Sequence, residues 1–432
     1  MANSSWNKAN GVLEGFKKFP LFRLLYRLSW APKVYHFFLG LAGAVIYWFP
    51  GRRIKVIGIT GTKGKTTTVE LISSILEAAG KKTALLSSLR IKIGEKSEKN
   101  TFGNSMPGRF FVQGFLSQAA KERCEYAIIE VTSQGIVLSR HRFIDWKIAV
   151  LTNLAPEHIE SHGSFENYRA AKLKFLKMAA RSGARVFLNR DNESYEFFSK
   201  NLTGGDIVPF SKRTLEGFRI KNPDLNSVFY QENMAAAYEV TKSLGVDGDV
   251  VCLALAEFKG VPGRFDFVQR KPFAVVVDYA HTPDSLEAIY KAVRPEALYG
   301  KSGGKLICVL GSAGGGRDKW KRPAMGKIAA QYCDAVILSD EDPYDENPGE
   351  ILDQIESGFK DAEKRRLKPE NTFKILDRRE ALKKAVSLAG KGDSVIATGK
   401  GSEMSIHIAR GKTVPWDEKE VAEEILSSLK KI

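Results

Sequence analysis

The sequence is poor in cysteine and has no low-complexity tract, no internal repeat and no C-x-x-C pair. It therefore indicates neither a disulfide-rich secreted scaffold nor a structural zinc site. Hydrophobic residues make up 43% and charged residues 27% of the 432 positions, which is typical of a globular protein of two or three domains. We expect the four cysteines to be reduced core residues of a cytoplasmic protein: Cys124, Cys252, Cys308 and Cys333.

Acidic residues are fewer than basic ones, with 50 Asp and Glu against 66 Lys and Arg, so the formal net charge is +16. Such an excess favours a polyanionic partner, which could be a nucleotide, a nucleic acid or an anionic membrane surface. Much of the charge is scattered through predicted helices such as 360–368, as on an ordinary solvated surface. No nucleic-acid recognition motif or aromatic platform accompanies it, so we expect no nucleic-acid partner.

One segment near the N-terminus lacks charge altogether. Residues 34–50 contain no Asp, Glu, Lys or Arg, are rich in aromatic residues, and have basic residues on both sides. Because a bilayer core requires about twenty apolar residues, a transmembrane helix is the weakest of three interpretations, and no signal-peptide cleavage site follows. A helix packed on the next domain and an interfacial anchor on anionic lipid are equally consistent with the pattern.

The most informative motif is an apolar run followed by a glycine-rich turn and the triplet Gly-Lys-Thr. Residues 54–59 predict a buried strand and residues 69–79 a helix, so the turn between them has the context of a phosphate-binding loop. Its spacing departs from G-x-x-x-x-G-K, which leaves a glycine turn with a chance lysine as the alternative. We expect the loop to bind ATP, with Lys65 on the outer phosphates and Thr66 on magnesium. The predicted nucleotide-binding residues are Gly61, Thr62, Lys63, Gly64, Lys65, Thr66 and Thr67.

Strand-like and helix-like stretches alternate from residue 51 onward, which predicts an α/β fold with mostly parallel sheets. We expect an apolar and basic helical segment at 1–50, a central P-loop ATPase domain at 51–260 and a C-terminal Rossmann-like domain at 261–432. Ligands are expected at the carboxyl ends of the strands, in the cleft between the domains. The predicted strands after the first are 126–131, 148–151, 186–189, 274–278, 305–311, 335–339 and 394–398.

Two further constellations suit metal-assisted phosphate chemistry. Glu130 lies at the end of a predicted strand, and two of only six histidines, His158 and His162, follow the next one. Oxygen ligands with one imidazole suit magnesium bound largely through phosphate and water. By itself a carboxylate at a strand end is weak support for a metal site, because most such residues are simply solvated.

Taken in order, these motifs resemble those of the Mur ligase superfamily, and within it the UDP-N-acetylmuramoyl-tripeptide synthetase (MurE) type. The similarity extends over about residues 51–425. It is carried by the segments 61–68, 130–133, 152–163, 168–172, 263–264, 277–284, 316–323 and 399–403.

The resemblance implies ATP-dependent amide-bond formation through an acyl phosphate, with an amino acid added to a muramoyl-peptide precursor during peptidoglycan synthesis. Such a reaction serves cell-wall biogenesis, cell shape and cell division. By this similarity Lys65 binds the β and γ phosphates, and Thr66 and Glu130 hold one magnesium ion. His158 helps to hold a second, supported by Lys172 after carbamylation by CO2. The alternative for Lys172 is an ordinary exposed helix lysine.

The same resemblance implies roles for further residues. Asn233 is placed near the adenine, Arg264 at the γ-phosphate and Asp278 at the ribose, with His281 as a nucleotide contact. Arg317 could equally cap a glycine-rich loop. The expected acceptor and amino-acid contacts are Thr132, Ser133, Arg317, Asp342, Tyr344, Gly399 and Glu403.

Two departures from the family pattern bear on the substrate. Family members of this type usually open with a domain that binds the UDP end of the acceptor, and we expect it here to be missing or reduced to the apolar segment. Diaminopimelate-adding members carry Asp-Asn-Pro-Arg where this chain has Glu-Asp-Pro-Tyr at 341–344. Because a carboxylate-clamping arginine is lost and Asp342 could accept an ammonium group, lysine or another diamino acid is the preferred donor.

We further hypothesise that residues 20–50 make a peripheral contact with the inner face of the membrane. That contact would dock an otherwise cytoplasmic, monomeric enzyme near lipid-linked or unusual muropeptide acceptors. Two alternatives stay open: a ligase of the folylpolyglutamate or cyanophycin type, and a non-catalytic partner subunit with the same fold.

Overall fold

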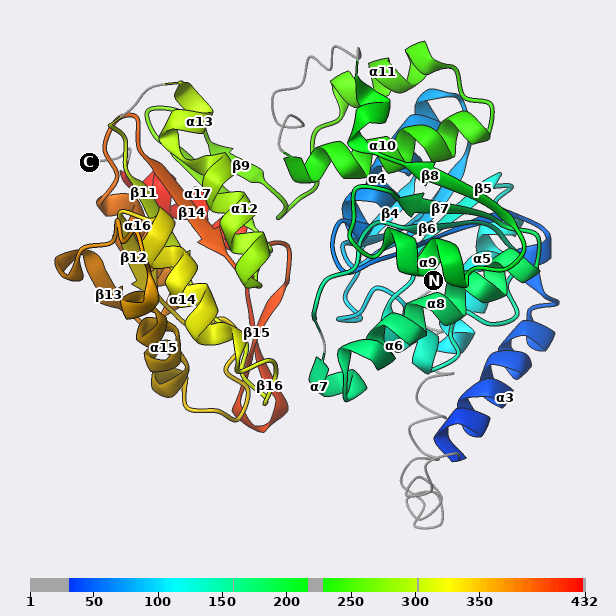
Figure 1. Cartoon of the computed structure of the whole chain (residues 1–432), viewed down its shortest axis with the longest axis horizontal. Helices are drawn as coiled ribbons and strands as arrows, with labels where there is room; N and C mark the ends of the chain where they lie inside the picture. Colours follow the sequence, from blue (N-terminus) through cyan, green and yellow to red (C-terminus); the bar gives the residue numbers. More distant parts are fainter. Residues whose placement is uncertain (1–30, 158, 217–227, 301–302, 430–432) are drawn as a thin grey trace. The chain divides into compact units, whose positions relative to one another are not determined.

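The structure is a computed structural model that describes residues 31–157, 159–216, 228–300 and 303–429 (Figure 1). The chain divides into two compact units. The N-terminal unit comprises residues up to 156 together with 164–221 and 230–258, and the C-terminal unit comprises 157–163, 222–229 and 259–432.

The N-terminal unit is built on an eight-stranded sheet with the order β4-β3-β2-β5-β1-β6-β7-β8. The strands from β2 to β8 in this order are parallel, and β3 and β4 add an antiparallel edge. The bounds are β1 (Lys55–Thr60), β2 (Thr83–Leu86), β3 (Arg90–Ile93), β4 (Lys96–Lys99), β5 (Tyr126–Glu130), β6 (Trp146–Leu151), β7 (Arg185–Asn189) and β8 (Asp206–Phe210).

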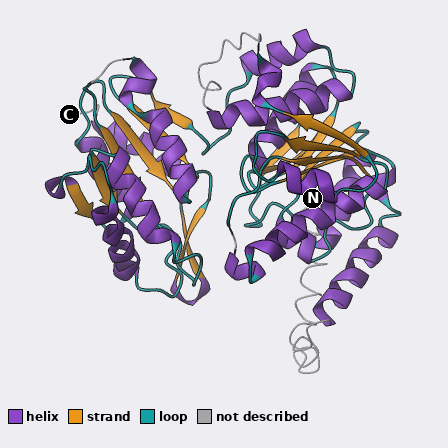
Figure 2. Cartoon of the chain, in the orientation of Figure 1, coloured by secondary structure: helices purple, strands orange, loops and turns teal. Residues whose placement is uncertain are grey.

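Helices cover both faces of this sheet, as Figure 2 shows. The central strands are therefore buried on both sides and consist of continuous apolar runs. The helices along this part of the chain are α3 (Ala31–Ile46), α4 (Lys65–Ala78), α5 (Arg109–Lys121), α6 (Ser133–Val137), α7 (Ile159–His162), α8 (Phe165–Arg181), α9 (Tyr195–Asn201), α10 (Val228–Ser243) and α11 (Gly248–Glu257). Of these, α7 belongs to the C-terminal unit.

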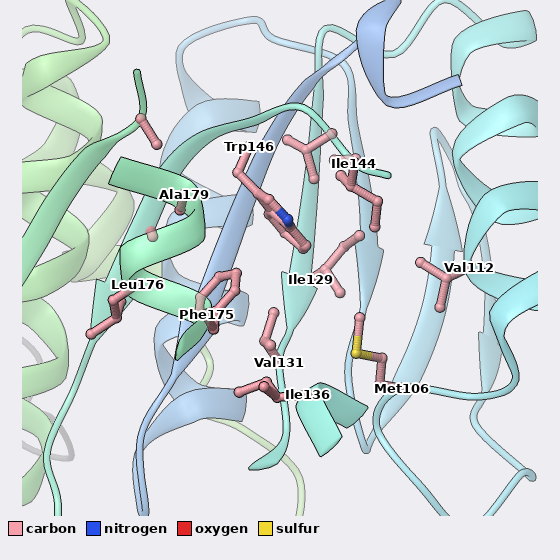
Figure 3. Packing of buried hydrophobic residues seen from close by; sticks show 14 of the residues in the cluster. Met106, Val112, Ile129, Val131, Ile136, Ile144, Trp146, Phe175, Leu176 and Ala179 are labelled. Atoms are coloured by element: carbon pink, nitrogen blue, oxygen red, sulfur yellow. The ribbon is translucent and has the colours of Figure 1, made fainter. Parts of the chain in front are cut away.

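The core of the N-terminal unit lies between the sheet and the helices that cover it, among them α8. Trp146 of β6 and Phe175 of α8 meet edge to face, with ring centroids 5.2 Å apart (Figure 3). Both rings lie against Gly58 in the middle of β1, where an added Cβ would approach them to 2.7 Å. The glycine therefore lets two large aromatic residues close the core directly over the strand that leads into the phosphate-binding loop.

The C-terminal unit has a six-stranded sheet with the order β13-β12-β11-β14-β10-β9, in which β9 is the antiparallel edge. Helices α12 (Pro283–Val293) and α16 (Arg378–Ser387) both pack on strands of this sheet, and a separate hairpin follows. The strands are β9 (Asp266–Gln269), β10 (Ala274–Asp278), β11 (Leu306–Leu310), β12 (Ala335–Leu338), β13 (Thr372–Lys374), β14 (Ser394–Thr398), β15 (Ser405–Ile408) and β16 (Lys412–Pro415). The other helices are α13 (Pro295–Tyr299), α14 (Lys321–Tyr332), α15 (Pro348–Ser357) and α17 (Glu418–Leu429).

The predicted α/β class with mostly parallel sheets is confirmed, and each strand expected from the sequence is present with bounds that differ by two residues at most. The prediction of four reduced cysteines is wrong for two of them. Cys308 in β11 and Cys333 after α14 form a disulfide, whereas Cys124 and Cys252 are free. Their separation of 25 positions gives no sign of the pairing, since the two cysteines meet only when α14 returns the chain to the start of β12 beside β11. Within the described ranges, no helix is long and apolar enough to cross a bilayer.

Candidate active site

The glycine-rich turn lies between β1 and α4, as the sequence predicted. Gly61 and Gly64 have φ values of 153° and 77°, in the region that favours glycine. A side chain at Gly61 would collide with Thr152, and one at Gly64 would collide with Asn233. Helix α4 starts directly after Gly64 without a side-chain cap, so its first N–H groups can bind an anion.

Residues 152–155, which follow β6, brace this loop from behind. The Asn153 side chain accepts from Lys63 N at 2.8 Å and donates to Lys63 O at 3.2 Å. Thr152 Oγ1 also donates to Lys63 O, at 2.6 Å. A loop backbone held by so many hydrogen bonds is preorganised, and binding polyphosphate costs it little further ordering.

Helix α8 braces the same loop with two side chains from the Tyr-x-x-Ala-Lys motif. The hydroxyl of Tyr168 lies 3.0 Å from Thr62 Oγ1, and Lys172 Nζ donates to Gly61 O at 2.7 Å. Lys172 is only 1% exposed, so the alternative of an ordinary exposed lysine is wrong. Lys65 Nζ donates to Thr62 O at 2.7 Å, which places a second ammonium group over the loop.

A hydroxyl and a carboxylate suited to magnesium lie next to each other at the start of α4. Thr66 Oγ1 donates to Glu130 Oε2 at 3.0 Å, and both side chains are buried. Ser88 joins them, because its N–H donates to the same Oε2 at 3.0 Å and its hydroxyl lies 2.9 Å from Thr66 Oγ1. This hard-oxygen set fits a magnesium ion that also binds phosphate oxygens and water. Ser88 has no motif around it that could have predicted its place.

The remaining predicted residues of the N-terminal unit are placed as follows. Asn233, in α10, lies beside the loop, with its Oδ1 3.3 Å from Thr68 Oγ1. Thr132 caps helix α6 through Gly135 N at 3.0 Å, and Ser133 is buried in the first turn of that helix. His158 lies outside the described residues. No group of three or more His, Cys, Asp or Glu side chains suited to a metal occurs in the described ranges.

In the C-terminal unit, Arg264 and Asp278 are close in space and share neighbours at the end of β10. The carboxylate of Asp278 is buried and accepts from Phe265 N and Ala280 N, each at 2.7 Å. Burial raises the pKa of Asp278, and the Arg264 guanidinium opposes the rise. Arg264 stacks over the ring of Tyr279 at 4.0 Å.

Two histidine contacts accompany this cluster. His281 lies 3.0 Å from Glu157 Oε1 through Nε2, and its Nδ1 lies 2.8 Å from Tyr279 O. The Tyr279 hydroxyl donates to Glu403 Oε1 at 3.1 Å, and the Glu403 carboxylate, together with burial, raises the pKa of Tyr279 well above its usual range. The predicted residues Arg264, His281 and Glu403 thus all contact the same tyrosine.

Asp342 is not open in the way that the sequence suggested. Its Oδ1 accepts from Lys400 Nζ at 2.9 Å and from His407 N at 2.7 Å. Lys400 is fully buried and also donates to Glu403 Oε2 at 2.6 Å. An internal ammonium group, that of Lys400, therefore already contacts one of the two carboxylate oxygens that the sequence offered to a substrate ammonium.

Tyr344 belongs to a stack of three side chains. Its ring is parallel to that of His407 at 5.1 Å, and the Arg317 guanidinium lies 4.8 Å from its centroid. Tyr344 has a φ of 51°, which a bulky residue rarely adopts. The backbone thus holds an aromatic ring beside Arg317 at some conformational cost.

Three buried oxygen atoms near the carboxyl ends of β11 and β12 have no hydrogen-bond partner among the described residues. They are Ser312 Oγ, Asp318 Oδ1 and Glu341 Oε2. Burial raises the pKa of Glu341, which lies against Gly399. Unsatisfied buried oxygens are costly, and the ends of adjacent parallel strands are where α/β sheets bind ligands. We refer to these oxygens, next to the predicted residue Gly399, as the candidate second ligand site.

Comparisons with known proteins find two Mur ligase domains in this chain. Residues 59–240 match the family model described as Mur ligase middle domain, and residues 263–401 match Mur ligase, glutamate ligase domain. The UDP-N-acetylmuramoyl-L-alanyl-D-glutamate–2,6-diaminopimelate ligase of Syntrophomonas wolfei is 36% identical over 411 residues, covering 90% of this chain and 81% of that protein.

Two solved structures extend the comparison. A structure of a UDP-N-acetylmuramoyl-L-alanyl-D-glutamate–2,6-diaminopimelate ligase has a TM-score of 0.56 at 26% identity, and covers 87% of this chain and 79% of its own. The bifunctional folylpolyglutamate synthase/dihydrofolate synthase of Yersinia pestis, complexed with AMPPNP and a Mn ion, has a TM-score of 0.62 at 17% identity. It covers 91% of this chain and 93% of its own, and at this identity the likeness concerns the fold.

Proposed function

The chain belongs to the Mur ligase family of ATP-dependent ligases, and from this premise we propose that it adds an amino acid to a muramoyl-peptide precursor of peptidoglycan. A carboxylate of the acceptor attacks the γ-phosphorus of ATP, so that ADP leaves and an acyl phosphate forms. The amine of the amino acid then attacks the acyl carbon, which forms the amide bond and releases phosphate. The observation that carries the proposal is the braced loop with Thr66 and Glu130 in contact.

In this proposal the N-terminal unit supplies charge neutralisation and positioning, which are the main requirements of phosphoryl transfer. Gly61 to Thr67 would hold the phosphates, with Lys65 on the outer ones. Thr66 and Glu130 would bind one magnesium ion, whose charge offsets that of the phosphate oxygens.

Carbamylation of Lys172 is part of the proposal, and the geometry supports it. A carbamate keeps one N–H on Nζ, so the hydrogen bond to Gly61 O can persist while the new carboxylate extends beyond it. That carboxylate, together with His158, would hold a second ion.

The remaining assignments belong to the nucleotide and the acceptor. We propose that Asn233 lies near the adenine, that Arg264 contacts the γ-phosphate and that Asp278 and His281 contact the rest of the nucleotide. Thr132 and Ser133 would contact the acceptor through the first turn of α6. ATP and nucleotide-linked acceptors are cytoplasmic compounds, so we place the reaction in the cytoplasm and expect a monomer to perform it.

The amino-acid donor is assigned from the second ligand site. Glu341 Oε2 is a buried carboxylate oxygen without a donor among the described residues, and an ammonium group would satisfy it. Tyr344 stands where a diaminopimelate-adding pattern has arginine, so the clamp for a distal carboxylate is absent. We therefore keep lysine or another diamino acid as the donor and move the ammonium-accepting role from Asp342 to Glu341, with Arg317 and Glu403 at its borders.

The test is a product assay with purified enzyme, ATP and UDP-N-acetylmuramoyl-L-alanyl-D-glutamate. Lysine, ornithine, diaminopimelate and glutamate are supplied singly, and products are identified by mass spectrometry. We expect kcat/KM for lysine to exceed that for diaminopimelate by roughly tenfold, the effect of one polar contact. Glutamate with a folate acceptor should give no product, and its ligation would favour the folylpolyglutamate alternative.

A pair of adjacent carboxylates gives a matched control. Glu341→Gln should raise the KM for lysine and remove the preference over diaminopimelate. Asp340→Asn, at the half-buried neighbouring residue, should leave the KM for lysine and the preference over diaminopimelate unchanged. A wild-type preference for diaminopimelate would reject the donor assignment and leave the ligase function standing. Absence of every product despite bound ATP would reject the ligase function and favour a non-catalytic partner subunit.

A further inference from the structure

Helix α3 buries small side chains and exposes several large apolar ones, which is unlike an ordinary surface helix. Gly40, Gly43 and Ala44 are buried, whereas Phe38 is 59% and Val45 53% exposed. The positions Val34, Phe38 and Val45 recur at helical spacing and form one stripe, and residues 34–50 carry no charge. The helix packs against α5 on the outside of the N-terminal unit (Figure 1). Its small residues and Phe37, whose ring contacts that of Phe143, face the protein, while Val34, Phe38 and Val45 stay exposed.

The end of α3 places a tryptophan in the solvent at a conformational cost. Phe49 N donates to Ala44 O and Trp48 N to Val45 O, which is the hydrogen-bond pattern of a Schellman helix end. The residue that this pattern puts in the left-handed region is usually glycine, yet here it is Trp48, with a φ of 55°. Trp48 is 83% exposed, so no contact within the described chain offsets the strain.

Together with Ile46, these exposed apolar residues make up what we call the α3 face: Val34, Phe38, Val45, Ile46 and Trp48. It holds five of the eleven large apolar side chains that are exposed among the described residues, so it is the main apolar patch there. A patch of this kind on a soluble unit marks a binding surface.

Basic side chains border the α3 face at its C-terminal end. Arg52, Arg53 and Lys55 are all exposed, and no acidic residue occurs between Val34 and Lys55. The Arg53 guanidinium donates to Tyr47 O at 3.1 Å, and the Arg52 guanidinium lies 4.8 Å from the Phe49 ring centroid, so both stay beside the helix end. Exposed aromatic residues flanked by arginine are the composition of segments that lie in the interface of an anionic bilayer.

We infer that the α3 face binds the surface of an anionic lipid bilayer, with the helix lying in the plane of the interface and Trp48 at headgroup level. Charge decides between this partner and a second copy of the chain. The chain carries +16, so two copies repel each other, whereas a bilayer with anionic headgroups attracts Arg52, Arg53 and Lys55. The inference goes beyond the ligase function and does not depend on it.

The experiment measures co-sedimentation of the full chain with vesicles. One set contains phosphatidylcholine only and the other equal parts of phosphatidylcholine and phosphatidylglycerol. We expect binding to the anionic set that falls with added salt, and roughly a tenfold loss for Trp48→Gly or Phe38→Ser. Replacing Arg52 and Arg53 by glutamate should weaken binding by about fivefold or more per arginine.

Trp48→Gly separates binding from folding. Glycine fits the left-handed position better than tryptophan, so thermal stability should stay equal or rise while binding falls. Leu253→Ser on α11 is the matched control, because Leu253 is 58% exposed on another helix of the same unit and should not alter binding. Ligation with soluble substrates should be unchanged in all these variants. Failure of the membrane-binding inference can therefore be distinguished from failure of the ligase proposal.

Two results would overturn the inference. One is equal vesicle binding by the wild type and a Phe38→Ser, Trp48→Gly double variant. The other is a wild type that ignores vesicles but dimerises in sedimentation velocity, with Phe38→Ser abolishing the dimer, since the α3 face would then be an interface between two copies.

Discussion

The two regions that we propose to bind ligands are built in different ways. In the N-terminal unit the phosphate loop is held mostly by uncharged groups, such as Thr152, Asn153 and Tyr168, that contact loop backbone or a loop hydroxyl. In the C-terminal unit the loops are held by buried charges. Arg378 pairs with Glu418 at 2.9 Å while donating to Asp340 O and Thr398 O, just before the two segments that carry Glu341 and Gly399.

The difference has a physical consequence. A neutral side chain that holds a loop can be removed at the cost of one hydrogen bond, about 1 kcal/mol, whereas an unpaired buried ion costs several times more. We therefore expect changes at the phosphate loop to affect turnover first, and changes beneath the second ligand site to affect folding first.

Lys172→Ala should show the largest effect. If Lys172 acts as a carbamate, the variant loses a metal-supporting carboxylate, and turnover should fall roughly a thousandfold, or about 4 kcal/mol in the barrier. Formate, which supplies a small carboxylate, should then restore at least part of the activity. Turnover measured against formate concentration checks this.

Lys65→Ala is the matched variant, since Lys65 contributes an ammonium group to the same loop. Its activity should fall as far, without rescue by formate. Lys174→Ala, at an exposed position of the same helix, should be close to wild type. Equal responses of the Lys65 and Lys172 variants to formate would count against the carbamate.

Glu418→Gln should have the next largest effect, on stability. The change leaves Arg378, 1% exposed, without its counter-charge, and we expect the C-terminal unit to lose about 3 kcal/mol of unfolding free energy. That value is at the low end of the usual range because Arg378 keeps two backbone carbonyls. Hydrogen exchange of the β12 and β14 amides measures the loss within this unit.

The control for Glu418 lies on the same helix. Glu424 pairs with Arg379 at 2.6 Å, but the two side chains are 62% and 48% exposed. Glu424→Gln should therefore cost less than about 0.5 kcal/mol, as for most exposed ion pairs. Similar losses from the two variants would mean that burial of charge does not distinguish the C-terminal unit as we argue.

The same contrast explains how much the sequence could predict. The phosphate loop is local in sequence, and its strand, turn and helix each have their own pattern, so the fold class and the place of Lys65 and Thr66 followed from periodicity and glycine spacing. Ser88 was not predictable, because it reaches Glu130 from a loop with no motif. The antiparallel edge strands β3 and β4 were missed for a similar reason, since β4 is exposed throughout and has no apolar alternation.

Pairings between distant segments account for what the sequence could not show. Nothing in the sequence indicates that Lys400 and the backbone of His407 would reach Asp342. Cys308 and Cys333 likewise meet only through the pairing of β11 with β12. Such contacts depend on which strands become neighbours, a property of the whole sheet rather than of any motif.

His141 departs from this contrast, because it is a buried histidine in the unit whose phosphate loop is held mostly by neutral groups. It is fully buried, neither ring nitrogen has a partner among the described residues, and burial lowers the pKa of His141 to about 3. The unfolded chain, with a histidine pKa near 6.5, thus binds more protons than the folded one below that pH. Stability should be unaffected above pH 6.5 and should fall by about 2 kcal/mol at pH 5.

His141→Leu should remove that dependence and raise stability at pH 7, since it replaces two unsatisfied nitrogens with an apolar side chain. The hydrogen bond from Trp146 Nε1 to the carbonyl of residue 141 is a backbone contact and survives the change. Hydrogen exchange of the β6 amides at pH 7 and pH 5, corrected for the intrinsic rate, measures the difference within the N-terminal unit. If the His141→Leu variant lost as much stability between pH 7 and pH 5 as the wild type, the acid sensitivity would come from other groups.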